Sequence, residues 1–200
     1  MGEKIVVVNS NVICDTYGLN SKEIIQVCEK DILQLINKEY ILMERDIVEK
    51  NAAFKQIISY CLITYQDEIF MTRRTKKQTE SRLHNMYSVG VGGHIGASDV
   101  KNEDVVVNGM LRELYEEVFI PSDIKYHFLG IINDNSLEVN TVHMGLCYVI
   151  NLSDRDCSIR ETEKLEGQWV QIKDIYKYMP EMETWSEILL NSYLKTVGAN

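Results

Sequence analysis

The sequence has no long hydrophobic run, only two prolines and fewer basic than acidic residues. No apolar stretch approaches the roughly 20 residues of a transmembrane helix, so we expect no membrane partner. Residues 1–6 offer too short an apolar stretch for a signal peptide. With 21 Lys and Arg against 30 Asp and Glu, the net charge is −9. A nucleic-acid backbone requires a basic surface, so we expect no nucleic-acid partner.

Paired cysteine motifs and flexible linkers are also missing. The five cysteines are odd in number and scattered without a CxxC pair, which predicts reduced thiols in a cytoplasmic protein. No Pro- or Gly-rich linker divides the chain, so we expect residues 1–54 to form an N-terminal extension that packs on a core of residues 55–200. A hydrophobic content of 45% and a charged content of 26% are typical of a globular protein.

The hydrophobic pattern predicts strands and helices in both parts. In the extension we expect a strand at residues 5–8 paired with residues 12–14, a helix from Asn20 to about Lys38, and a short helix at 44–53. In the core we expect strands at 56–64, 68–72, 87–91, 125–132, 142–150 and 168–172, and helices from 173 and at 181–195. Mixed strands flanked by helices indicate an α+β fold.

The most informative segment joins a glycine-ended strand to an acidic helix. Glu113, Glu116 and Glu117 stand at spacings i, i+3 and i+4, so a helix places them on one face. Like charges at this spacing destabilise a helix by roughly 0.2–0.5 kcal/mol per pair, which favours a cation between them. Carboxylate oxygens suit Mg²⁺ or Mn²⁺. A solvated acidic face is the plain alternative, but Gly92 and Gly93 just before the helix favour the metal.

These residues resemble the Nudix box of the Nudix hydrolases. Gly93 fits the first glycine of the box, residues 112–117 fit its second half in full, and Ile120 fits its last aliphatic position. The family has Glu where this chain offers either Asp99 or Asp104, and Phe119 replaces a glycine. The resemblance covers roughly residues 55–180 and implies an α/β/α sandwich with a mixed sheet. We expect the box helix to bury one apolar face, made of Val107, Leu111, Leu114 and Val118.

A softer resemblance points to one branch of the family, the predicted phosphoesterases. It depends on residues 82–84, 87–94 and 142–145. That branch implies no particular substrate.

The resemblance implies a role for each residue of the box. Glu116 and Glu117 bind Mg²⁺ or Mn²⁺, and Glu113 is either a third ligand or the general base. Arg112 orients the carboxylates, and a backbone carbonyl of Gly92 or Gly93 completes the metal shell. The implied reaction is attack of metal-activated water on a phosphorus of a nucleoside diphosphate linked to another moiety.

Several residues outside the helix are candidates for binding the substrate. The basic segment 73–82 is predicted to hold phosphates, because the arginine fork matches phosphate oxygens, although a solvated hairpin end is equally plausible. His94 could reach a phosphate, but a loop histidine is more often structural. Asp134 and Glu138 could supply an extra ligand or base, whereas His143 is better explained as a buried, satisfied histidine. The predicted substrate-binding residues are Arg73, Arg74, Arg82, His94 and Glu138.

The sequence also leaves two alternatives to the hydrolase. An isomerase like isopentenyl-diphosphate isomerase needs a cysteine close before His94, where this chain has Val91, Gly92 and Gly93. A non-catalytic sensor of a nucleotide or sugar effector could discard the three glutamates, yet all are present. The identity of the diphosphate substrate and the oligomeric state stay open, although the extension could support a homodimer.

Overall fold

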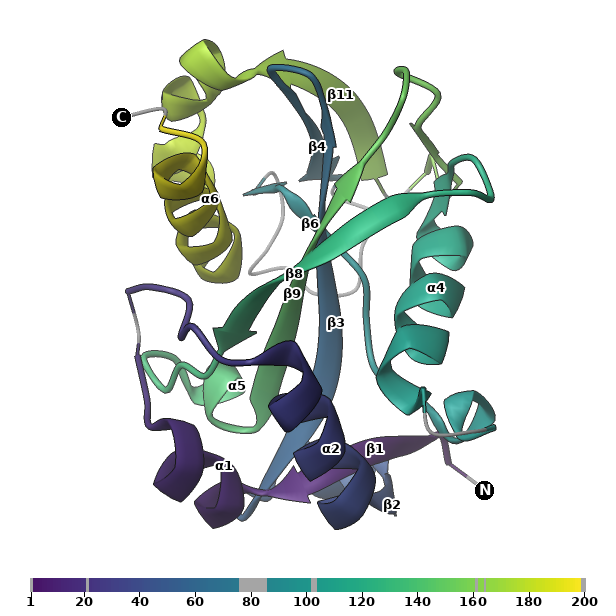
Figure 1. The fold of residues 1–200 in the computed structure, drawn as a ribbon, viewed down its shortest axis with the longest axis vertical. Coiled ribbons are helices and arrows are strands. Elements are labelled where there is room, and N and C mark those ends of the chain that lie inside the picture. The colour runs from purple at the N-terminus through teal and green to yellow at the C-terminus, as the bar shows by residue number, and fades with distance from the viewer. Residues whose placement is uncertain are drawn as a thin grey trace.

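A mixed sheet forms the centre of the molecule, and helices cover both of its faces (Figure 1). The computed structural model describes residues 2–20, 22–75, 86–101, 104–160, 162–163 and 165–198. Within these residues the main sheet contains nine strands. They are β1 (Lys4–Asn9), β2 (Ile41–Glu44), β3 (Phe54–Tyr65), β4 (Glu68–Arg74), β5 (Tyr87–Ser88), β6 (Gly90–Val91), β8 (Lys125–Ile132), β9 (His143–Asn151) and β11 (Leu165–Gln171). Two short strands, β7 (Val118–Phe119) and β10 (Ser158–Ile159), pair separately.

Strand β3 is the centre of the sheet and separates two hydrophobic cores. It pairs in parallel with β9 and antiparallel with β1, β4 and β6. Alternate residues of a strand point to opposite faces. Ile57, Cys61 and Ile63 join one core, whereas Tyr60 and Leu62 join the other. The predicted α+β sandwich with a mixed sheet is therefore confirmed.

The helices divide between the two faces of the sheet. Helix α4 (Val105–Glu117) contributes to the first core together with α1 (Ser10–Tyr17) and α2 (Glu29–Glu39). Helix α6 (Thr184–Thr196) covers the opposite face (Figure 1). Two four-residue helices, α3 (Arg45–Val48) and α5 (Glu138–Thr141), lie in connections. None of the helices in the described parts of the chain is long and apolar enough to cross a membrane.

The N-terminal segment is part of the sheet, and its details differ from the expectation. Residues 5–8 are fully buried in β1, which pairs with both β2 and β3. The predicted partner strand at residues 12–14 is wrong, because these residues lie in α1. The helix begins where the Asn9 side chain accepts a hydrogen bond from the Asn11 N–H at 2.9 Å. Asparagine favours such a helix start, so residues 9–11 begin a helix and do not connect two paired strands.

The helix predicted from Asn20 begins only at Glu29. The Asn20 side chain does accept bonds from the N–H groups of Lys22 and Glu23, as at a helix start. The chain then extends, because Ile25 exchanges two backbone hydrogen bonds with Ile131, at 2.8 and 3.0 Å. The short helix predicted at 44–53 is limited to α3. The helix predicted from residue 173 is a 3-10 helix at Ile172–Lys177.

Helix α4 buries a face that is rotated from the predicted one. Its buried residues are Val105, Val106, Gly109, Met110 and Leu114. Of the predicted face, Leu114 is buried, Val107 and Leu111 are only partly buried, and Val118 already belongs to β7. A Cβ on Gly109 would lie 2.6 Å from Ile95 Cδ1, so this glycine lets the helix approach the segment that follows β6.

Candidate active site

The glycine turn after β6 and the carboxylates of α4 are in close contact. A Cβ built on Gly93 would lie 2.5 Å from Glu113 Oε2, so only glycine leaves room for this carboxylate. Gly92 has a φ of 142°, and a Cβ there would lie 2.1 Å from the Ser59 carbonyl oxygen. The Gly93 carbonyl accepts a hydrogen bond from Ser59 N at 3.0 Å. The turn is thereby fixed to β3 and lies against the Glu113 carboxylate of α4.

Arg112 joins the residues of this turn to the carboxylates. Its Nε and Nη2 donate to the two oxygens of Asp99, each at 2.8 Å. Nη1 donates to Glu113 Oε1 at 2.8 Å and to Glu116 Oε2 at 3.0 Å, and Nη2 also donates to the His94 carbonyl at 2.9 Å. The guanidinium therefore fixes both the acidic face and the loop opposite it.

Asp99 is the acidic partner that the sequence left open between two positions. Asp99 is 1% exposed, and its Oδ2 accepts a hydrogen bond from Gly96 N at 2.8 Å. Although burial acts in the other direction, the hydrogen bonds from Arg112 and Gly96 hold the pKa of the Asp99 carboxyl below its usual value. Asp104 instead precedes the first residue of α4 and is exposed. Of the two aspartates, Asp99 is therefore the one that pairs with Arg112.

The three glutamates differ in their surroundings. Burial raises the pKa of Glu113, and the nearby Glu116 adds to the rise, while Arg112 opposes it. The Glu116 side chain is 59% exposed. Glu113 and Glu117 line the principal cavity of the described structure, which has a volume of about 650 Å³. Glu113 and Glu117 therefore both border the cavity, whereas the Glu116 side chain is largely exposed to solvent.

Residues from distant parts of the sequence, from Glu3 to Trp185, line the cavity. Its wall includes Gly92, Gly93 and His94 from the glycine turn, together with Tyr60 and Trp185, whose rings pack edge to face with centroids 5.8 Å apart. The N-terminal segment also contributes, because Glu3 and Arg45 line the same space and their side chains pair at 3.0 Å. The extension is thus a structural part of the cavity wall.

The predicted substrate-binding residues are distributed unevenly around this cavity. His94 lines it, and its Nε2 lies 2.9 Å from Gln56 Oε1. Arg74 reaches the cavity rim through Glu183, with Nε and Oε1 2.5 Å apart. Arg73 stacks over the Tyr87 ring, at 5.5 Å from its centroid.

Among the described residues, Arg73, Arg74 and Glu138 do not line the cavity. Arg82 lies outside the described residues. Glu138 is exposed at the start of α5, while its neighbours Leu137 and Val139 line the cavity. Asp134 is buried and accepts hydrogen bonds from Ser136 N and Oγ and from Asn140 Nδ2, so it supports this segment from within.

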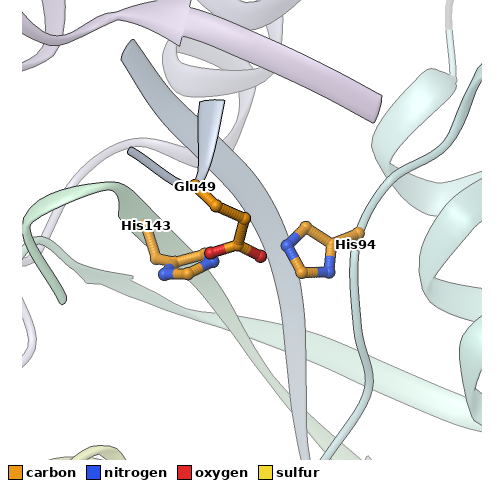
Figure 2. Close-up of side chains that lie close together, drawn as sticks. All are labelled: Glu49, His94 and His143. Carbon is orange, nitrogen blue, oxygen red and sulfur yellow. The ribbon is translucent and has the colours of Figure 1, made fainter. Parts of the chain in front are cut away.

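Sequence reasoning missed a further acidic residue, Glu49, which lies beside the two histidines that line the cavity. Its carboxylate lies between the imidazole rings of His94 and His143 (Figure 2). The two ring centroids are 5.3 Å apart. Burial, helped by Arg45 and His143, lowers the pKa of His94 to about 3, and burial also lowers the pKa of His143. Nothing in the spacing of residues 49, 94 and 143 could signal this meeting, because three separate elements bring it about.

Comparisons with known proteins agree with this geometry. No family model matches the chain. Protein YmaB of Bacillus subtilis (strain 168) is 33% identical over 171 residues, which are 80% of this chain and 82% of YmaB. The crystal structure of Tm1382, a candidate Nudix hydrolase, superposes with a TM-score of 0.83 at 28% identity, over 97% of this chain and 100% of that one. The chain belongs to the Nudix hydrolase superfamily.

As a Nudix hydrolase, this protein is an enzyme that acts on phosphoric anhydrides. The Nudix domain of NrtR from Shewanella oneidensis, complexed with ADP-ribose, superposes with a TM-score of 0.56 at 15% identity. That match covers 72% of this chain and 88% of the other. At this identity it shows the shared fold alone. The Nudix box helix is α4, and the Nudix glycine turn follows β6.

Proposed function

We propose that this protein is a Mg²⁺- or Mn²⁺-dependent hydrolase that cleaves the diphosphate linkage of a nucleoside diphosphate joined to another moiety. The observation that carries the proposal is the contact between the glycine turn and the acidic helix. Glu113 lies against Gly93, and both line a cavity that also contains Glu117. Carboxylates and backbone oxygens therefore converge where a diphosphate could enter.

The residues fit a hard divalent ion. Glu113, Glu116 and Glu117 supply carboxylate oxygens from one helix face, and no sulfur ligand interrupts them. The raised pKa of Glu113 comes from burial and from repulsion by Glu116, and a cation would relieve both. In the proposal Glu116, Glu117 and a backbone carbonyl of Gly92 or Gly93 hold the ion, with Glu113 as either a third ligand or the general base. When bound, the ion would neutralise diphosphate charge and lower the pKa of water.

The protein groups have separate roles in the proposed reaction. Glu113 accepts a proton, since it is partly buried, lines the cavity and has a raised pKa. Glu116 and Glu117 keep their negative charge toward the ion. Arg112 holds Glu113 and Glu116 in place through Nη1 while Asp99 fixes its other nitrogens. Arg112 is thus a positioning residue that fixes the geometry of the acidic face.

The substrate is proposed to lie along the cavity toward Trp185 and the histidines. Arg74 would supply positive charge near the rim, beside Glu183. His94, Arg73 and Arg82 stay predictions for substrate binding. Glu138 stays a prediction for a substrate contact from the α5 segment. The ring pair of Tyr60 and Trp185 gives one wall an apolar, aromatic character that suits the second moiety of the substrate.

The test is a panel of diphosphate compounds incubated with the full-length protein and Mg²⁺ or Mn²⁺. The panel holds nucleoside diphosphate sugars, ADP-ribose, dinucleoside polyphosphates, nucleoside triphosphates and coenzyme A, and products are identified by mass. We expect turnover of at least one class, complete dependence on the metal, and a loss of roughly 10²-fold or more in Glu117→Gln and Glu113→Gln.

Glu39→Gln, which alters a carboxylate on α2 that pairs with Lys38, is the matched control. It should keep the rate of the unchanged protein. Turnover that survives in Glu117→Gln would contradict the proposed site. Binding of a panel compound that raises the melting temperature without any turnover would favour an effector-binding role over hydrolysis.

A further inference from the structure

Three side chains from distant parts of the chain meet where His94 and His143 line the cavity. Glu49 follows α3, His94 follows the glycine turn, and His143 begins β9. One ligand atom from each lies within 4.8 Å of the others. Figure 2 shows the Glu49 carboxylate pointing between the two imidazole rings. Such convergence requires the N-terminal extension, the Nudix turn and the central sheet together.

Each side chain is held from behind by a further contact. His143 Nδ1 lies 2.6 Å from the Val139 carbonyl, which can only accept, so Nδ1 carries the proton and Nε2 keeps its lone pair. His94 Nε2 lies 2.9 Å from Gln56 Oε1. A histidine that binds a metal usually makes such a bond to a carbonyl or carboxylate, because the bond fixes ring orientation.

Glu49 can turn toward a cation without stranding its present partner. Its Oε1 pairs with Arg45 Nε at 3.2 Å, and Arg45 Nη1 also pairs with Glu3 Oε2 at 3.0 Å. Within the described parts of the chain, no hydrogen bond joins the Glu49 carboxylate to either imidazole. The carboxylate is therefore close to both rings but is not already used by them.

We propose that Glu49, His94 and His143 bind a divalent transition-metal ion, separate from the ion held by the Nudix glutamates. Two imidazoles and one carboxylate are the ligand set of many zinc sites, with the fourth position left for water or substrate. Zn²⁺ takes ligands at about 2.0–2.2 Å, so a modest rotation of the Glu49 side chain would close the present spacing. His94 and His143 line the same cavity, so the open position of the ion could be reached by a ligand bound there.

The ligand chemistry separates this site from the Nudix site. Imidazole nitrogen suits Zn²⁺, Co²⁺, Ni²⁺ and Cu²⁺, whereas Mg²⁺ prefers oxygen ligands and retains its water. The proposed site should thus stay available in excess Mg²⁺. The proposal does not depend on hydrolysis, since the three residues could bind the ion in a protein without turnover.

Cobalt is the probe that tests this site, because Co²⁺ bound to nitrogen ligands absorbs visible light. The full-length protein is stripped of metal with a chelator, kept in millimolar Mg²⁺ and titrated with Co²⁺. We expect one equivalent to bind with a visible absorption band and to be displaced by one equivalent of Zn²⁺. Glu49→Gln and His143→Gln should each lower the affinity at least tenfold, with folding checked by circular dichroism.

Two control variants make the outcome specific to these residues. His127→Gln changes an exposed histidine on β8 and should keep the absorption band. Glu117→Gln changes one of the Nudix glutamates and should also keep the absorption band, even if hydrolysis is lost. A band that persists in both folded variants Glu49→Gln and His143→Gln would overturn the proposal. A band that disappears only in Glu117→Gln would also overturn it, by assigning the ion to the Nudix site.

Discussion

Gly92 and Gly93 are adjacent, yet their side-chain positions meet different neighbours. At Gly93 the obstacle is the Glu113 carboxylate, the end of a side chain that Arg112 holds at 2.8 Å. At Gly92 the obstacle is the Ser59 backbone, and φ is also positive. A side-chain end can move more easily than a strand. The two glycines therefore separate a requirement of the site from a requirement of the fold.

Gly93→Ala should lose activity and keep most of its stability. The added methyl pushes Glu113 from Arg112 and from the cavity, so metal-dependent turnover should fall by at least about 10²-fold. The free energy of unfolding, measured in urea, should fall by no more than about 1 kcal/mol. Gly92→Ala is the paired comparison and should lose well over 2 kcal/mol, because a backbone atom and a positive φ both oppose it. Equal stability losses in the two variants would contradict this distinction.

Asp99 should make stability depend on pH in acid. Its pKa in the folded protein is lower than the value of about 3.9 expected for an unfolded chain. The unfolded chain therefore binds the proton first. The stabilisation from Asp99 is complete above the unfolded pKa and is lost as the pH falls through the folded pKa.

Asp99→Asn should lower the free energy of unfolding by about 2 kcal/mol at pH 7, since charged hydrogen bonds to Arg112 are lost. The difference between variant and unchanged protein should shrink as the pH falls from about 5 toward 2. Urea unfolding at several pH values measures this. A difference independent of pH would contradict the proposed role of the Asp99–Arg112 pair.

At the scale of elements, the segment between β8 and β9 is built around Asp134. This residue is fully buried, and three donors from Ser136 and Asn140 surround its carboxylate. Nearby, the buried Lys55 donates to Asn135 Oδ1 at 2.8 Å and to the Asn140 carbonyl at 3.2 Å. Burial lowers the pKa of Lys55 to about 8, with Cys14 and Asp134 opposing the shift. The segment is fixed from inside, while Leu137 and Val139 face the cavity.

Asp134→Ala should loosen this segment and lower stability by about 2–3 kcal/mol, because buried donors lose their acceptor. Amide hydrogen exchange should accelerate in residues 135–141 before it does in β3. Glu138→Ala is a control in the same segment, and its exposed side chain should leave the free energy of unfolding within about 0.5 kcal/mol. Unchanged exchange in Asp134→Ala would contradict the supporting role of this carboxylate.

The accuracy of prediction varied with how local the signal was. The long strands β3 and β9, buried along most of their length, follow from largely apolar runs, and the acidic face of α4 follows from helical spacing. The strand predicted at residues 12–14 is wrong because the Asn9 side chain caps a helix there. The helix predicted at residues 20–28 is wrong because the backbone of Ile25 pairs with that of Ile131. The choice between Asp99 and Asp104 and the position of Glu49 depend on contacts between distant segments, which spacing along one sequence does not contain.

At the scale of the whole molecule, the N-terminal segment and the Nudix core share one sheet. Strand β1 pairs with β3 through residues 7–9, and residues 5–8 are fully buried. Val6, Val8, Ile13, Ile32 and Ile36 belong to the same hydrophobic core as α4. A boundary near residue 54 therefore divides the sequence more clearly than it divides the packing.

A chain that begins at residue 54 should not fold independently. Its β3 would lose a neighbour, and the core beside α4 would lose the contacts of α1 and α2. We expect no cooperative thermal transition and no dispersed amide spectrum for this fragment, whereas the full chain should show both. Adding residues 2–53 as a separate peptide is the control, and recovery of the transition would show that packing was missing. A fragment that melts cooperatively by itself would contradict this prediction.

The parallel pairing of β3 with β9 also has a consequence for how the chain is made. Thr64 and Ile150 are bonded across these strands, although 86 residues separate them. Closing so long a loop is costly in entropy, and such nonlocal contacts slow folding. During synthesis the ribosome releases β3, the glycine turn and the acidic helix well before β9. The central strand must therefore wait with one edge unpaired, and the nascent chain can acquire its native sheet only after residue 151 has emerged.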